Sequence, residues 1–390
     1  MGIVVEIRKP EENLDDKIKS YKWQQRKKVI LTVVTLLAAV VSTYLLVEMQ
    51  TYSKMRPLES YGSKGTDNSS YQQFADGVLK YSRDGIAYLN RKGEEQWNQS
   101  YQIKNPFVST TKKSAAVADR GGNDIYVFDK KELKGEIHTN YPIERIAVAE
   151  NGIVSVLLRN ESSPKIVCYD ATGNVLVEHR ASLTGTGYPI GMAISPDGTR
   201  LQVSYLCVAD GVQATRVAYL DFEKSEEDEK EYRQTEDIYK NTVLPVSFFV
   251  SRRTSVLVGE QSFLIYKEAE QPKATRTVEL HKEVRSFFHD EEYLGFILKN
   301  DGEGYELRLY DMEGNQKLSK TFTGEYSNVK AADGNIILYD GKNCLIFSEL
   351  GVKKFEGEAD KEILEILPIV GINKYLVMSA DGMEEVRLVK

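Results

Sequence analysis

The four histidines of this 390-residue sequence are the side chains best suited to bind a transition metal or to transfer a proton near neutral pH. They are His138, His179, His281 and His289. No two of them lie at the short spacing of a metal-ligand pair, so a zinc or copper site would need histidines from separate repeats to converge. We therefore interpret them as surface or half-buried imidazoles and predict no metal site.

Carboxylates and thiols give no stronger indication of catalysis. General acid–base chemistry needs two carboxyl groups at a fixed spacing across a cleft, and pairs such as Asp301 with Glu303 and Asp119 with Asp124 are numerous. Among 58 acidic residues such pairs arise by chance, and we interpret them as turn residues. Each cysteine lies in an apolar segment of a different repeat, which is typical of a buried free thiol. The cysteines are Cys168, Cys207 and Cys344.

Two further segments have compositions that are found in binding sites. Gly185–Gly191 resembles a phosphate-binding loop in its glycines, but no Lys-Ser or Lys-Thr pair follows, and no helix is expected behind it. We interpret this segment as a connection between repeats. The acidic run Glu223–Asp237 is interpreted as a solvated hairpin extension, with a docking arm for a basic partner as the alternative. The sequence thus predicts no catalytic residue, no cofactor-binding residue and no cofactor.

The elements that must position these residues are short β-strands. Asp-Gly occurs eight times and Asn-Gly once, and both dipeptides favour tight hairpins. A strand with the pattern apolar-x-aromatic-Asp, followed by a turn and often by glycine, recurs at intervals of 37 to 51 residues. These strands end at Asn90, Asp129, Asp170, Asp221, Lys267, Asp311, Ser348 and Lys390. Because one four-stranded propeller blade takes ~40–45 residues, the repeat predicts an all-β ectodomain that forms a β-propeller.

The repeats favour eight blades, with seven as the alternative. The first repeat lacks a recognisable inner strand, and the last repeat ends after its third strand. We therefore expect a strand from the N-terminal side to close the ring. For residues 362–367 a helical turn is the alternative to an inner strand. The inner strands that line the channel are expected at 142–148, 189–194, 243–250, 284–288 and 363–370.

One turn points to known repeats. Ser195-Pro196-Asp197-Gly198 follows an apolar strand and resembles the turn of WD40-like and quinoprotein-like propeller blades. The whole layout resembles an uncharacterised family of single-pass, membrane-anchored, propeller-like proteins of Gram-positive anaerobes. This resemblance covers nearly the full length. It implies a topology and transfers no catalytic residues.

A single apolar segment, Val29–Val47, contains 19 residues without a charge. At ~1.5 Å rise per residue, a helix of this length approaches the ~30 Å hydrocarbon core of a bilayer. Residues 1–28 hold eight Lys and Arg, against three in the twenty residues after the segment, which predicts a cytoplasmic N-terminus. Without a small-x-small cleavage site, we predict an uncleaved signal anchor rather than a signal peptide. The expected organisation is a cytoplasmic segment 1–28, a transmembrane helix 29–47, a stalk 48–70 and an extracytoplasmic propeller 71–390.

These features favour a binding function. The net charge of −7 argues against a nucleic-acid partner. We predict a scaffold or adaptor that is anchored in the cell membrane through residues 29–47 and binds an envelope protein. The alternatives are a ligand sensor that signals through a cytoplasmic partner, and a propeller enzyme that acts on glycans or peptides. A quinone-cofactor propeller should be rich in tryptophan, yet the sequence has only Trp23 and Trp97.

Overall fold

The computed structural model describes residues 14–61, 69–160, 163–222, 233–267 and 272–390. The chain divides into two compact units, Met1–Thr51 and Tyr52–Lys390. Most of the acidic run 223–237 lies outside the described residues, and its last part belongs to a strand.

The first unit contains one long helix, α1 (Leu14–Glu48), which includes the whole apolar segment 29–47. Within it, the hydroxyl groups of Thr32 and Thr35 donate hydrogen bonds of 2.9 and 2.6 Å to the carbonyl oxygens of Lys28 and Leu31. Over the described part of the chain, however, no helix is both long enough and apolar enough to qualify as a membrane span.

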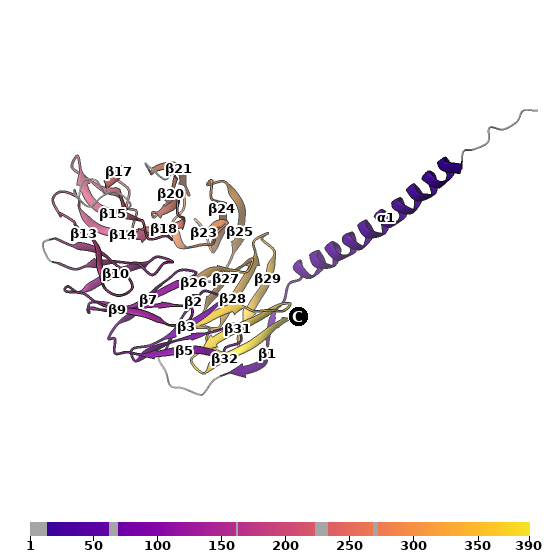
Figure 1. Ribbon diagram of the computed structural model, residues 1–390, viewed down its shortest axis with the longest axis horizontal. Coiled ribbons are helices and arrows are strands. Elements are labelled where there is room, and N and C mark those ends of the chain that lie inside the picture. Colours follow the sequence, from indigo (N-terminus) through magenta and orange to yellow (C-terminus); the bar gives the residue numbers. More distant parts are fainter. Residues whose placement is uncertain (1–13, 62–68, 161–162, 223–232, 268–271) are drawn as a thin grey trace, which may run out of the picture. The chain divides into compact units, whose positions relative to one another are not determined.

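The second unit is a β-propeller (Figure 1). Within the described residues its strands form eight antiparallel sheets of four strands each, which confirms eight blades and excludes the alternative of seven. Seven of the sheets follow the sequence order, as expected for consecutive hairpins, and the eighth combines both ends of the unit.

We number the blades along the chain and give the strands of each from first to fourth. Blade 1 is β2 (Ser70–Phe74), β3 (Gly77–Tyr81), β4 (Gly85–Leu89) and β5 (Glu95–Ser100). Blade 2 is β6 (Pro106–Thr110), β7 (Ser114–Asp119), β8 (Asp124–Asp129) and β9 (Leu133–His138). Blade 3 is β10 (Ile143–Val148), β11 (Val154–Leu158), β12 (Lys165–Tyr169) and β13 (Val175–Arg180). Blade 4 is β14 (Tyr188–Ile194), β15 (Arg200–Ala209), β16 (Val212–Asp221) and β17 (Arg233–Lys240).

The second half of the ring has the same plan. Blade 5 is β18 (Val246–Ser251), β19 (Thr254–Val258), β20 (Ser262–Lys267) and β21 (Lys273–Glu279). Blade 6 is β22 (Val284–His289), β23 (Tyr293–Lys299), β24 (Tyr305–Asp311) and β25 (Gln316–Phe322). Blade 7 is β26 (Asn328–Ala332), β27 (Asn335–Asp340), β28 (Asn343–Ser348) and β29 (Lys353–Glu358). Blade 8 is β30 (Glu365–Pro368), β31 (Lys374–Ser379), β32 (Gly382–Val389) and β1 (Lys54–Tyr61).

The inner strands lie where the sequence predicts them. The first strands of neighbouring blades contact one another, as β10 does with β14 and β14 with β18, so they surround the central channel. β30 is a strand, which excludes the helical turn considered for residues 362–367. One prediction is wrong: the first repeat does have an inner strand, β2, whose polar residues Ser70, Gln72 and Gln73 hide it from a search for apolar strands.

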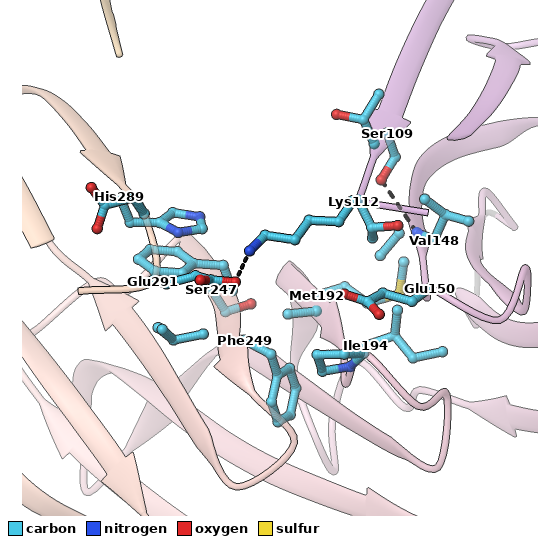
Figure 2. Close-up of a pocket in the computed structure, with 18 of the residues that line it drawn as sticks. Ser109, Lys112, Val148, Glu150, Met192, Ile194, Ser247, Phe249, His289 and Glu291 are labelled. Atoms are coloured by element: carbon cyan, nitrogen blue, oxygen red, sulfur yellow. Dashed lines mark hydrogen bonds and ion pairs between the residues drawn. The ribbon is translucent and has the colours of Figure 1, made fainter. Parts of the chain in front are cut away.

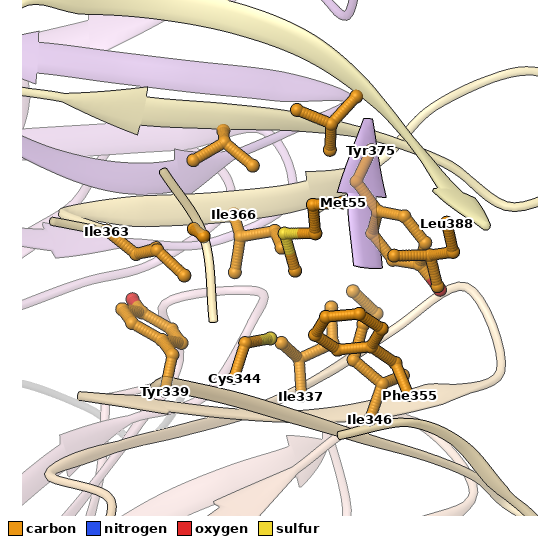
Figure 3. Packing of buried hydrophobic residues seen from close by; sticks show 14 residues of the cluster. Met55, Ile337, Tyr339, Cys344, Ile346, Phe355, Ile363, Ile366, Tyr375 and Leu388 are labelled. Atoms are coloured by element: carbon orange, nitrogen blue, oxygen red, sulfur yellow. The ribbon is translucent and has the colours of Figure 1, made fainter. Parts of the chain in front are cut away.

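The ring is closed by a strand from the N-terminal side, as predicted. β1 pairs antiparallel with β32 and becomes the fourth strand of blade 8. Just before it, Tyr52 forms an isolated bridge with Phe355 of blade 7. Met55 of β1 packs with Phe355 and Leu388 in the apolar cluster between blades 7 and 8 (Figure 3). The predicted stalk 48–70 is therefore corrected at Lys54–Tyr61, which belongs to the propeller, while residues 62–68 lie outside the described part.

The recurring aspartate of the sequence repeat is a turn residue. After the third strand of blades 1, 3 and 6, an Oδ1 atom accepts hydrogen bonds from the backbone N–H groups two and four residues later. These residues are Asn90, Asp170 and Asp311. The glycine three residues later has a positive φ, and in blades 3 and 6 a Cβ atom there would press on the outer strand of the preceding blade. The motif thus supports the contact between blades.

Candidate binding site at the channel mouth

A cavity of about 840 Å³ opens at one end of the channel, where the first strand of each blade turns into the second. Among the described residues, it is lined by blades 2 to 7. We call this cavity, with the turns that surround it, the channel mouth. Its volume falls in the range of ~300–1,000 Å³ that is typical of ligand pockets.

One wall of the mouth is apolar. Blade 3 contributes Ile146 and Val148 from β10, and blade 4 contributes Met192 and Ile194 from β14 (Figure 2). Ile146 and Met192 are half-buried and face the cavity, whereas Val148 and Ile194 are buried and also pack in the apolar clusters between neighbouring blades. This wall supplies apolar area without a charge of its own.

Aromatic rings continue the wall in blades 5 and 6. Phe248 of β18 stacks on His289 of β22, with ring centroids 4.0 Å apart and planes within 4°. The imidazole of His289 is exposed at the mouth, and the walls that crowd it lower its pKa, because a partial loss of water disfavours the charged form. His289 is therefore neutral at pH 7 and acts as one more flat ring.

The opposite wall is acidic. The turn between β22 and β23 carries Asp290, Glu291 and Glu292, and the turn after β28 in blade 7 adds Glu349. Asp290 is held by the turn itself, since its Oδ1 accepts the N–H groups of Glu292 and Tyr293 at 2.7 Å each. Partial burial, and then the like charges of Asp290 and Glu292, raise the pKa of Glu349. The acidic wall therefore carries more negative charge than its surroundings compensate.

A lysine crosses the mouth between these walls. Lys112, in the turn between β6 and β7 of blade 2, forms an ion pair with Glu291 of blade 6. In an eight-bladed ring these blades are opposite each other, and Figure 2 shows the side chain of Lys112 extended over the cavity toward Glu291. The neighbouring Lys113 instead pairs with Glu150 of blade 3, at 2.6 Å.

The structure distributes the four histidines over separate positions. His138 and Asp124 form a pair of 2.8 Å on the exposed outer half of blade 2. His179 belongs to β13, and His281 lies in the loop before blade 6 with a φ of 56°. Across the described residues, no group of three or more His, Cys, Asp or Glu side chains is arranged to hold a metal ion. Of the four, His289 alone lines the mouth.

The other chemical candidates are absent from the described lining of the mouth. Cys168 and Cys344 are buried free thiols, and burial raises the pKa of Cys168 to about 12, so it is unreactive at neutral pH. Cys207 is a half-buried free thiol on β15. Asp119 accepts the backbone N–H of Asn105 at 2.9 Å.

Two predicted turn segments have the expected form. Ser182 begins the turn that contains Gly185 and connects blades 3 and 4, because its carbonyl oxygen accepts the N–H groups of Gly185, Thr186 and Gly187. Asp301 and Glu303 lie in the exposed turn between β23 and β24. These segments lie away from the mouth. Of the residues that line the mouth, sequence reasoning singled out His289 and Pro196 but neither Lys112 nor the acidic turn of blade 6. The available signal was the charge of the turns that follow predicted inner strands, above all Asp290-Glu291-Glu292.

Comparison with known proteins identifies the fold and a family. Similar solved structures include Sqt1 of Saccharomyces cerevisiae, with a TM-score of 0.55 and 10% identity over 87% of this chain and 100% of that one. BamB of Moraxella catarrhalis has a TM-score of 0.52 and 13% identity over 85% of this chain and 99% of that one. AztD of Citrobacter koseri has a TM-score of 0.52 and 11% identity over 75% of this chain and 87% of that one.

At these identities the likeness shows the propeller fold alone. No curated protein matches the sequence. The model of one family matches residues 48–388. The chain therefore belongs to the family of unknown function DUF5711.

Proposed function

We propose that this protein is an interaction scaffold that binds a protein partner at the channel mouth. The observation that carries the proposal is the mouth itself, an open cavity of about 840 Å³ with an apolar wall and an acidic wall. Protein recognition commonly combines apolar and aromatic anchors with a charged surround, and turns on a rigid framework suit this purpose. The propeller supplies such a framework, because its blades pack on one another around the whole ring.

We further propose that the scaffold is anchored in the cell membrane, with the propeller outside the cytoplasm. The support is the uncharged segment Val29–Val47 and the excess of Lys and Arg before it. The backbone is helical throughout this segment, and the threonine hydroxyls within it bond to the helix itself, as hydrocarbon surroundings require. The anchor would hold the channel mouth close to a partner in the envelope.

Photo-crosslinking in intact cells tests this function with the full-length chain. A photoreactive amino acid is placed at Phe249 in the mouth or, as the matched control, at Asp301 in an exposed turn at the other end of blade 6. We expect one protein to be captured from Phe249 and not from Asp301. A membrane-impermeant biotin reagent applied to the same cells should label the propeller.

Each outcome has a defined meaning. Equal capture from both positions, or none from Phe249, would overturn the mouth as the binding site. Biotin labelling only after cell lysis would overturn the extracytoplasmic location while leaving the scaffold intact. Release of a small molecule from the purified chain, without a protein partner, would favour the sensor.

A further inference from the structure

The charges at the channel mouth are unbalanced. Blades 6 and 7 contribute four carboxylates, and Lys112 is the cationic side chain among the described residues that line the cavity. Lys113 is already paired with Glu150 on the other side, so it adds no compensation to the acidic wall. Burial, and to a smaller extent the neighbouring charges of Asp290 and Glu292, raises the pKa of Glu349.

The lysine that crosses the mouth is held weakly. Side chains of both partners are exposed, at 61% for Lys112 and 72% for Glu291. Ion pairs of this kind contribute little free energy, because water already solvates both charges well and long side chains lose rotamer freedom when they pair. An incoming ammonium or guanidinium group can therefore exchange with Lys112 at small cost.

What lies beside this ion pair determines which cation fits. The stacked rings of Phe248 and His289 and the half-buried Ile146 and Met192 of the apolar wall border the same cavity. A bare cation would leave this surface exposed to water, whereas a peptide with an apolar side chain next to its cation would cover it. An anionic ligand would be repelled by the acidic wall.

We propose that the channel mouth binds a peptide segment in which a lysine or arginine stands beside an apolar side chain, and that Lys112 occupies the cation position until this segment displaces it. The inference rests on the proposed function, because it takes the mouth as the binding site. It adds the chemical class of the partner and a competitor that belongs to the protein itself.

Fluorescence anisotropy with the purified full-length chain tests the proposal. The probes are three labelled pentapeptides, Gly-Phe-Lys-Phe-Gly, Gly-Phe-Glu-Phe-Gly and Gly-Ser-Lys-Ser-Gly, and spermidine serves as a competitor without apolar groups. We expect the first peptide to bind most tightly. Replacing Lys112 by methionine should tighten its binding about two- to fivefold, which is the affinity equivalent of a weak surface ion pair.

Matched variants separate this effect from a general change in charge. Lys113→Met removes the same charge from the next position, where the lysine pairs with Glu150, and should leave the affinity within about twofold. Glu291→Gln should weaken binding several-fold. These three substitutions affect exposed or turn positions, and equal melting temperatures would show that folding is unchanged.

The results that would contradict this inference differ from those that would contradict the proposed function. If Lys112→Met weakens binding or leaves it unchanged, Lys112 is no competitor. If the glutamate peptide or spermidine binds as well as the first peptide, the mouth does not select an apolar cation. Either result overturns the inference while capture from Phe249 in cells can still support the scaffold. Failure of that capture would instead remove the proposed function itself.

Discussion

Two carboxylates of the propeller, Glu306 at the seam between blades 5 and 6 and Glu349 at the channel mouth, have opposite surroundings. Glu306 accepts hydrogen bonds from Arg308 and Lys282 at 2.6 Å each and from Ser319 at 2.8 Å. The hydrogen bond from Arg308 is the main reason that its pKa falls from 4.5 to about 2. For Glu349, partial burial and then the like charges of Asp290 and Glu292 raise the pKa.

This difference shows that the paired carboxylate stabilises the fold, whereas the carboxylates at the mouth are available to bind a partner. At the seam, buried charge is fully paired and the surrounding side chains are closely packed, so the blades hold together. At the mouth, charge is left in excess next to an apolar wall, which lowers stability slightly and favours an external cation. Three substitutions test this contrast, from the largest expected effect to the smallest.

Replacing Phe355 by alanine should have the largest effect. This ring is fully buried between blades 7 and 8, against Met55 of the closing strand. Removing a buried phenylalanine side chain costs about 3–5 kcal/mol in lost burial and cavity formation. Urea unfolding should show this loss. Leu350→Ala, on the same blade but 74% exposed, is the control and should change stability little; equal losses would contradict the view that the seams carry the stability.

Replacing Glu306 by glutamine should cost about 1–3 kcal/mol at pH 7, because the neutral amide leaves Arg308 and Lys282 without the carboxylate whose pKa they help to lower from 4.5 to about 2. Because the folded pKa is the lower one, this stabilisation is present above pH 4.5 and is lost as the pH falls toward 2. The variant should therefore lose less stability than the wild type on acidification over that range. Thermal unfolding between pH 7 and pH 2.5 measures both effects, with Glu303→Gln at an exposed turn as the control. If the variant loses as much stability between pH 4.5 and pH 2.5 as the wild type does, Glu306 is not the carboxyl group with the lowered pKa.

Replacing Glu349 by glutamine should have the smallest effect, and of opposite sign. Since its pKa is raised in the folded state, the charged form disfavours folding at neutral pH. The variant should be as stable as the wild type or more stable by up to about 0.5 kcal/mol. It should also bind the lysine peptide more weakly. A clear loss of stability at pH 7 would show that Glu349 is a paired seam carboxylate after all.

Much of the fold could be predicted from the sequence because a propeller repeats local patterns. The turn aspartates such as Asp170 and the apolar inner strands depend on neighbouring residues, so their spacing gave eight blades. The sequence of β1 resembles a stalk for a physical reason. It is an outer strand with mostly exposed side chains, and Pro57 is tolerated there because an edge strand leaves some N–H groups unpaired.

The site could not be predicted in the same way, because it exists only in the closed ring. Lys112 and Glu291 are 179 positions apart in the sequence and meet because blades 2 and 6 are opposite each other. No local pattern records that proximity. The stacking of Phe248 on His289 likewise joins two blades. What the sequence offered was the charge of individual turns, without their neighbours.

The closure by β1 has a mechanical consequence. Helix α1 ends at Glu48 and β1 begins at Lys54. Tension applied to the helix therefore reaches β1, the strand that closes the ring, through only a few residues. The first contacts to bear that load are the bridge of Tyr52 with Phe355 and the first pairs of β1 with β32. Force on the N-terminal side thus acts on the one blade that the chain completes from both of its ends. If the chain is tethered, pulling would open the ring at blade 8 and leave the other seven blades, each a continuous run of hairpins, to unfold later.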